Sequence, residues 1–299
     1  MTENRRIPAC FARDYCVPTR SGSLEKLGAV ADMVAARGLA TVVDPGVLSL
    51  DRLLSLHDPA YVRAFLDGTG RLATSQNLPW SPALRTAVLS MQAGQLTAAD
   101  LAVRHGVAAN IANGFHHAGH ERGGGFCTFN GLALIAHAHP QRRVFVLDCD
   151  EHGGNGTEEF AARLPNLFNY SIFGTAFGCR GGVRSVAHPV ESTRSAFRGY
   201  HSALAAAFER IERWQADLVV YQAGADCHRE DPLGRGIATT ADLRARDASV
   251  FAFCREQRIP VVFTLGGGYQ EEERSAMLHA NTFETAVEVF AGNPSTAPA

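Results

Sequence analysis

The sequence lacks the features of several protein classes. No window approaches the about 18 consecutive apolar residues that a membrane span needs. Lys plus Arg total 28 against 30 Asp plus Glu, a formal net charge of −2, so the basic excess of a dedicated nucleic-acid binder is missing. The first ten residues, MTENRRIPAC, lack the apolar core of a signal peptide. We therefore expect a cytoplasmic protein that neither binds nucleic acid directly nor enters a membrane. Composition leaves its oligomeric state open.

Paired cysteines and nucleotide-binding loops are also missing. The seven cysteines include no CxxC pair, and an odd, scattered set in a chain of 299 residues is typical of reduced thiols, not of a disulfide framework. The glycine-rich segment 123–127, GGGFC, lacks the Lys-Ser/Thr of a P-loop, and GxGxxG does not occur. Nucleotide binding is therefore not expected.

Short runs rich in Val, Ile and Phe alternate with longer segments of helical periodicity. The runs predict strands at Ala40–Val43, Val107–Ile111, Val144–Asp148, Asn166–Ile172, Asp217–Gln222 and Pro260–Leu265. The periodic segments predict helices at Leu24–Arg37, Gln92–His105, Asn130–Ala138, Ser195–Trp214, Thr240–Glu256 and Ala276–Phe290. Several runs are apolar nearly throughout, as strands buried on both faces are. We expect an α/β fold with a largely parallel central sheet and helices on both faces.

No internal repeat or central linker divides the chain, so residues 1–292 are predicted to form one catalytic domain. The segment 293–299, NPSTAPA, is small and polar and is predicted to be a disordered tail.

Chemistry-bearing side chains follow four of the predicted strands. Ligands of open parallel sheets bind beyond the carboxyl ends of the strands. The segments at those ends carry, in chain order, His116 and His117, then Asp148, Asp150 and His152, then Asp226, and finally Tyr269. We expect these side chains to meet at one edge of the sheet.

Asp150 and His152 are two residues apart at a strand end, so their side chains point the same way. With Asp226 they form a set of one imidazole and two carboxylates, which leaves open positions on a divalent ion, as catalysis requires. Taken alone, the DxDxH segment is explained equally well by a helix cap at Asp148 and Asp150 and a local hydrogen bond from His152. The other residues at the same edge favour a metal site, which would accept zinc, Fe²⁺ or Co²⁺.

The histidine pair and the tyrosine suit proton transfer beside such a metal. An imidazole has an unperturbed pKa of about 6.5, so His116 or His117 can act as a general base while the other stabilises developing charge. Asp148 and Asn155 are the nearest candidates to orient the rings. Tyr269 follows three glycines and can donate to an oxyanion. Taken singly, these are also ordinary loop histidines and a packed surface tyrosine.

Together these segments resemble the histone deacetylase superfamily, which has the arginase–deacetylase fold. The matching segments are HDPAYV at 57–62, FHHA at 115–118, GGGFCTFN at 123–130, DCDEHGGNGT at 148–157, AGAD at 223–226 and GGGY at 266–269. The short chain and the Asn at position 155 make the sequence most similar to the class IV and bacterial deacetylase-like branch.

The resemblance implies a role for each residue of the predicted site. The zinc ligands would be Asp150, His152 and Asp226. The catalytic residues would be His117 as general base and acid, His116 as its electrostatic partner, Asp148 and Asn155 as the groups that orient the two rings, and Tyr269 as the donor to the scissile carbonyl. Many relatives have an Asp where Asn155 stands, so His117 is expected to be less basic here.

Two further sites follow from the resemblance alone. A structural potassium ion would be bound by Asp148, Asp150, His152, Ser171 and Ile172, the last two through backbone carbonyls. A substrate channel would be lined by Gly125, Phe126, Phe177 and Gly267.

The implied reaction is hydrolysis of N-acyl amides, with removal of acetyl or longer acyl groups from lysine side chains of proteins or peptides. Two alternatives stay open: an amidohydrolase for small acylated amines such as acetylpolyamines, and a catalytically silent protein that binds acyl-lysine. A dinuclear ureohydrolase of the same fold is disfavoured because its motif carries more Asp and His ligands. The chain departs from the family pattern at Phe173, where a His is usual, and throughout 174–187. The preferred acyl chain length and the physiological substrate are therefore left open.

Overall fold

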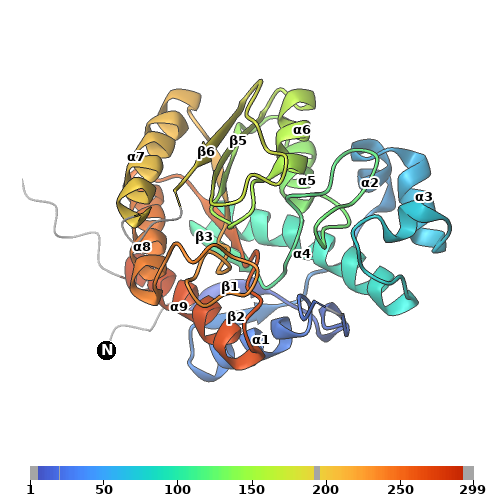
Figure 1. Ribbon diagram of the computed structural model, residues 1–299, viewed down its shortest axis with the longest axis horizontal. Helices are drawn as coiled ribbons and strands as arrows, with labels where there is room; N and C mark the ends of the chain where they lie inside the picture. The colour runs from blue at the N-terminus through green and yellow to red at the C-terminus, as the bar shows by residue number, and fades with distance from the viewer. Residues whose placement is uncertain (1–5, 20, 192–195, 292–299) are drawn as a thin grey trace, which may run out of the picture.

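The computed structural model describes residues 6–19, 21–191 and 196–291, which form one sheet with helices on both faces (Figure 1). The strands are all parallel, in the spatial order β2-β1-β3-β8-β7-β4-β5-β6. Their bounds are β1 (Ile7–Cys10), β2 (Ala40–Val43), β3 (Val107–Asn110), β4 (Val144–Asp148), β5 (Leu167–Phe173), β6 (Ser185–Pro189), β7 (Leu218–Gln222) and β8 (Val261–Thr264). The predicted fold class is confirmed.

Helices pack on both faces of this sheet. Their bounds are α1 (Lys26–Ala36), α2 (Leu50–Leu56), α3 (Pro59–Asp67), α4 (Pro82–His105), α5 (Gly131–Ala138), α6 (Asn155–Arg163), α7 (Ala196–Trp214), α8 (Thr240–Glu256) and α9 (Glu272–Ala291). Helices α1, α7, α8 and α9 cover one face, and α4, α5 and α6 cover the other, with α2 and α3 beyond α5 (Figure 1). Within the described ranges, none of the helices has the length and apolar character needed to cross a bilayer.

The central strands form the core. Every residue of β4, β7 and β8 is buried, because helices cover both faces of the sheet at these positions. Their continuous apolar character therefore predicted a parallel arrangement correctly.

Several elements were not predicted from the sequence. Strands β1 and β6 and helices α2, α3 and α6 are short, and short elements depend on tertiary packing more than on their own residue preferences. Helix α4 begins at Pro82 and not at Gln92. Its start carries a recognisable signal, since the Ser81 hydroxyl accepts a hydrogen bond from the Leu84 N–H at 3.0 Å and Pro82 occupies the first turn. Ser195 of the predicted helix and the predicted tail 293–299 lie outside the described residues.

Candidate active site

The loops after β3, β4, β7 and β8 meet at one edge of the sheet. Strands β4, β7 and β8 are neighbours, and β3 lies next to β8. Because parallel strands all end on the same side, the segments that follow them converge although they are far apart in the sequence. The loops at this edge carry the predicted metal ligands, the histidine pair and Tyr269, and Asn155 follows at the start of α6.

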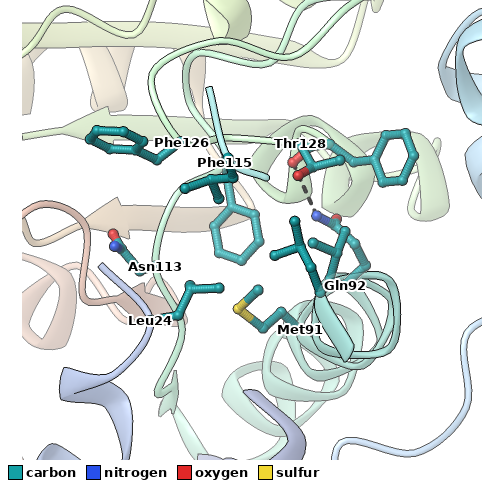
Figure 2. Close-up of a pocket in the computed structure, with 11 residues that line it drawn as sticks. Leu24, Met91, Gln92, Asn113, Phe115, Phe126 and Thr128 are labelled. Carbon is teal, nitrogen blue, oxygen red and sulfur yellow. Dashed lines mark hydrogen bonds between the residues drawn. The ribbon is translucent and has the colours of Figure 1, made fainter. Parts of the chain in front are cut away.

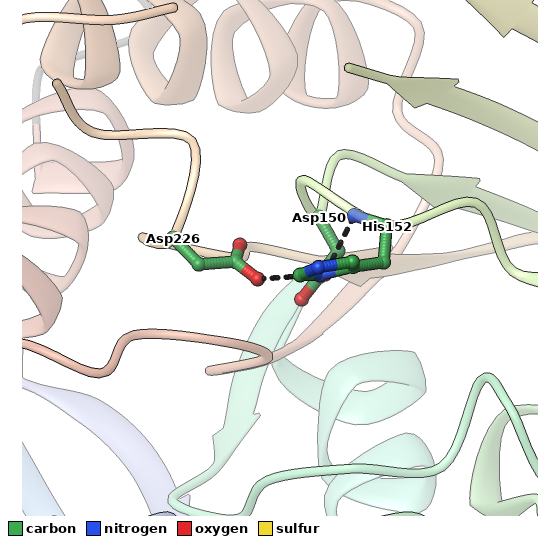
Figure 3. Close-up of side chains that lie close together, drawn as sticks. All are labelled: Asp150, His152 and Asp226. Atoms are coloured by element: carbon green, nitrogen blue, oxygen red, sulfur yellow. Dashed lines mark hydrogen bonds and ion pairs between the residues drawn. The ribbon is translucent and has the colours of Figure 1, made fainter. Parts of the chain in front are cut away.

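Asp150, His152 and Asp226 form a group that can hold a metal ion. One ligand atom from each residue lies within 4.8 Å of the others. The Nδ1 atom of His152 lies 3.1 Å from Oδ2 of Asp226 and 3.4 Å from Oδ1 of Asp150 (Figure 3). Both carboxylates are buried, whereas the imidazole is partly exposed. The set predicted from the sequence is therefore brought together at the end of β4 and β7.

The two buried carboxylates of this group repel each other, and a bound cation would reduce that repulsion. Burial, followed by the neighbouring Asp150 carboxylate, raises the pKa of Asp226 to about 7. Burial opposes protonation of His152, yet the two carboxylates outweigh it and raise the His152 pKa to about 11. The imidazole thus acts as counter-ion to two buried acids. A divalent cation would relieve the same repulsion, and a set of one nitrogen and two oxygen ligands suits zinc, Fe²⁺ or Co²⁺.

Two glycines bring backbone directly against the carboxylates. A Cβ atom at Gly224 would lie 2.6 Å from the Cα atom of Asp150, so no larger residue fits there. The Gly267 N–H donates to Oδ2 of Asp150 at 2.6 Å, and a Cβ at Gly267 would collide with the Asp226 carboxylate. Gly267, predicted as a channel residue, therefore also packs against the candidate metal ligands.

The histidine pair lies beside this group, and each ring has its own partner. Nδ1 of His116 is 2.8 Å from Oδ2 of Asp148, and Nδ1 of His117 is 2.8 Å from Oδ1 of Asn155. Asn155 is the first residue of α6, so the helix start determines where its amide lies. Both partners were named from the sequence as the nearest candidates.

The two imidazoles are pushed towards opposite protonation states. Burial opposes protonation of His116, but Asp148 and Asp150 outweigh it and raise its pKa to about 8. Burial, together with the adjacent His116, holds the pKa of His117 well below its ordinary value. A pair of groups with pKa values driven apart is the usual arrangement for separate acid and base roles. His117 is the neutral member, with an Nε2 lone pair free to accept a proton.

The loop that carries Tyr269 is held from two sides. Lys26, the single lysine of the sequence, is fully buried, and its Nζ donates to the carbonyls of Gly266 and Gly268 at 3.2 and 2.9 Å. The Tyr269 N–H donates to Oδ2 of Asp231 at 2.7 Å. Lys26 and Asp231 were missed from the sequence, because a lone charged residue in a helix or loop carries no pattern that signals burial.

Predicted channel residues surround His117 and Tyr269. The ring of Phe177 stacks on His117 with centroids 4.0 Å apart, and it is 44% exposed. The Phe126 ring lies 6.0 Å from that of Tyr269. Gly125 has a φ of +47° and a Cβ there would meet the His117 ring, so a side chain at this position would displace the imidazole.

A small cavity lies between α4 and the loops that carry Phe115 and Phe126 (Figure 2). Its volume is about 10 Å³, room for a single water molecule. Its walls are mostly apolar, but Gln92 Oε1 and Thr128 Oγ1 are buried there with no hydrogen-bond partner among the described residues.

Asp148 and Ser171, two residues of the predicted potassium site, are paired in register on β4 and β5. Ile172 follows on the same strand, and the Ser171 hydroxyl accepts a hydrogen bond from the Gly154 N–H at 3.0 Å. The potassium site stays a prediction.

This chain is similar to known proteins in both sequence and fold. The family model described as "Histone deacetylase domain" matches residues 20–284 of this chain. The chain is 32% identical over 246 residues to an uncharacterized protein of Picosynechococcus sp., covering 75% of this chain and 79% of that protein. It is 35% identical over 201 residues to histone deacetylase 2 of Arabidopsis thaliana, covering 64% of this chain and 51% of that protein.

In structure, the chain is similar to the crystal structure of an acetylpolyamine aminohydrolase from Burkholderia pseudomallei, with a TM-score of 0.81. That match covers 95% of this chain and 99% of the other at 20% identity, and at this identity it bears on the fold alone. The family match covers most of the chain and includes every residue of the candidate site. The chain therefore belongs to the histone deacetylase family of amide-bond hydrolases.

Proposed function

We propose that this protein is a metal-dependent deacylase, with zinc as its metal, that removes acyl groups from lysine side chains. The observation that carries the proposal is the meeting of Asp150, His152 and Asp226 within 4.8 Å, beside two histidines with oppositely displaced pKa values. A divalent ion bound there would supply Lewis acidity to the amide carbonyl and lower the pKa of a water molecule.

His117 is proposed as the general base and acid. Its Nδ1–H donates to Asn155, so Nε2 accepts the proton of the attacking water and then returns it to the leaving amine. The lowered pKa keeps the ring neutral before the reaction. His116 has a raised pKa through Asp148 and Asp150, and it places a positive charge next to the developing negative charge.

Tyr269 is proposed as the oxyanion donor. Its hydroxyl donates to the carbonyl oxygen as negative charge develops there. Burial, followed by Asp226, raises the Tyr269 pKa, so the hydroxyl keeps its proton. Lys26 and Asp231 bind the carbonyl and the N–H of the peptide bond between Gly268 and Tyr269, which limits the freedom of the tyrosine before substrate arrives.

The leaving amine is the open part of the proposal. Lysine side chains are favoured because the chain is short and lacks a long insertion that would narrow the entrance. A small acylated amine such as an acetylpolyamine is the second candidate, since the chain is also 32% identical over 176 residues, 53% of its length, to acetylpolyamine amidohydrolase 2 of Pseudomonas aeruginosa.

One panel of substrates tests both candidates. Zinc-loaded protein is incubated with acetyl-, trifluoroacetyl-, octanoyl- and myristoyl-lysine peptides and with acetylated polyamines, and the released amine is measured. Turnover of peptides supports lysine deacylation, and the best acyl length measures the acyl pocket. Turnover of polyamines alone supports the small-amine activity. No turnover with zinc bound would contradict both and favour a silent acyl-lysine binder.

A further inference from the structure

Arg246 on α8 is a fully buried arginine that binds the two loops carrying the candidate metal ligands. Its side chain is 1% exposed, and it is the largest of the fully buried side chains in the described residues. Its Nη1 atom donates to the carbonyl of Cys149 at 3.1 Å and to the carbonyl of Gly224 at 2.7 Å. Cys149 directly precedes Asp150, and Gly224 lies two residues before Asp226.

These carbonyls lie just beyond the point where β4 and β7 stop pairing. The paired register ends at Asp148 and Gln222, and the Cys149 N–H still donates to the carbonyl of Gln222 at 3.0 Å. Past that bond the backbone pairing of β4 and β7 stops, and the buried carbonyls of Cys149 and Gly224 need donors from elsewhere. One guanidinium nitrogen serves both, so Arg246 continues the connection between the strands up to the residues before Asp150 and Asp226.

The neighbouring carboxylate of Asp247 balances the charge of Arg246. Its Nε and Nη2 atoms lie 2.9 Å from Oδ1 of Asp247. Asp247 is also buried and accepts hydrogen bonds from the hydroxyls of Tyr221 and Thr282. The pair therefore adds no net charge next to the candidate metal site. Any effect of Arg246 on metal binding must come from the position of the two backbone segments.

We infer that Arg246 is a positioning residue for the metal site. By holding the carbonyls of Cys149 and Gly224 together, it sets the separation of the Asp150 and Asp226 carboxylates. The tight packing of Gly224 against Asp150 transmits any displacement of one loop to the other. The inference rests on the proposed function through its metal site.

The test measures metal affinity, not catalysis. Apo protein is titrated with Zn²⁺ against a chromophoric chelator, and Co²⁺ absorption spectra report the ligand geometry. The main variant is the double substitution Arg246→Met with Asp247→Asn, which removes the donors while keeping the net charge of the pair at zero. Arg246→Lys keeps the charge on a shorter, unforked side chain. The matched control is Arg244→Met on the same helix, because Arg244 pairs with Glu284 and Glu288 near the surface and not with the loops of the metal site.

We expect the double variant and Arg246→Lys to bind Zn²⁺ about 10–100-fold more weakly, as is typical when a group that orients metal ligands is removed. The Co²⁺ spectrum should change with them, and Arg244→Met should match the wild type. Unchanged or tighter Zn²⁺ binding in a folded variant would overturn the inference, because Arg246 would then not be what places the Asp150 and Asp226 carboxylates for the metal. If the double variant does not fold, Arg246→Lys alone decides. Failure of the wild type to bind Zn²⁺ or Co²⁺ would instead refute the metal-dependent function.

Discussion

Asn155 accepts a hydrogen bond from the Nδ1–H of His117 across 2.8 Å, and this bond leaves the ring's other nitrogen as the basic one. A neutral amide selects the tautomer without stabilising the protonated ring as a carboxylate would. Together with burial and His116, this keeps the His117 pKa low.

Asn155→Asp should therefore move the acidic limb of activity to higher pH. A base must be neutral to accept a proton, so kcat/KM falls as the pH drops through the His117 pKa. A carboxylate at 155 favours protonated His117 and raises that pKa by about one unit or more. The measurement is kcat/KM between pH 4 and 9, with Asn281→Asp on α9 as control. An acidic limb that stays in place would argue against His117 as the base.

Asp226→Asn should abolish both metal retention and activity. The substitution removes one charged ligand of three and leaves an amide, which is a poor ligand for zinc. Metal content after dialysis and turnover are measured on the same sample, with Asp100→Asn as control because that carboxylate is exposed and pairs with His139. Activity in metal-free Asp226→Asn protein would mean that the reaction does not use this site.

Tyr269→Phe should retain the metal and lose rate. Removing one oxyanion donor costs a factor of about 10²–10³ in kcat, with a smaller effect on KM. Tyr170→Phe is the control, since its hydroxyl contacts His188, away from the loops that carry the site. Full activity of Tyr269→Phe would remove the tyrosine from the mechanism.

Gly267→Ala should weaken metal binding although it adds only a methyl group. The new Cβ would collide with the Asp226 carboxylate, whereas Gly182→Ala meets no atom within 4 Å and is a matched control. Zn²⁺ affinity from chelator competition should fall in the first variant only. Equal affinities would show that the loop after β8 can move aside.

His57 should make the fold sensitive to acid. Burial lowers its pKa from 6.5 to about 3, and the neutral ring lies 2.9 Å from the Gly119 carbonyl and accepts the Asn130 N–H at 3.1 Å. As the pH falls, the unfolded chain protonates His57 before the folded protein does. The contribution of neutral His57 to the free energy of unfolding is therefore complete above pH 6.5. It is lost as the pH falls towards 3, at about 1.4 kcal/mol per pH unit.

Urea unfolding of the wild type and of His57→Gln at pH 7, 5 and 4 measures this effect. Glutamine does not titrate, so the stability advantage of the wild type over the variant should shrink as the pH falls. A constant difference would assign the acid sensitivity to other groups.

The sequence predicted those parts of the fold and site that local pattern determines. Strands β4, β7 and β8 are recognisable in the sequence as short apolar runs. The polar residues at their ends indicate the edge where Asp150, His152 and Asp226 meet. The rule that parallel strands end on one side is enough to bring these residues together.

The supporting residues could not be predicted in the same way. Lys26, Asp231 and Arg246 act through contacts with backbone carbonyls and N–H groups from distant parts of the chain. Almost every residue type has a backbone carbonyl and N–H, so no sequence pattern shows which of these groups a charged side chain will bind. Only the three-dimensional packing shows that these charges are buried.

The burial of Lys26 has a chemical consequence for the whole protein. This is the chain's single ε-amine, and it is 2% exposed beneath the loop of Tyr269. Reactive acyl donors modify accessible, unprotonated amines, and no lysine is available at the surface of this protein. An enzyme that removes acyl groups from lysine would thus expose no lysine of its own to the acylation that it reverses.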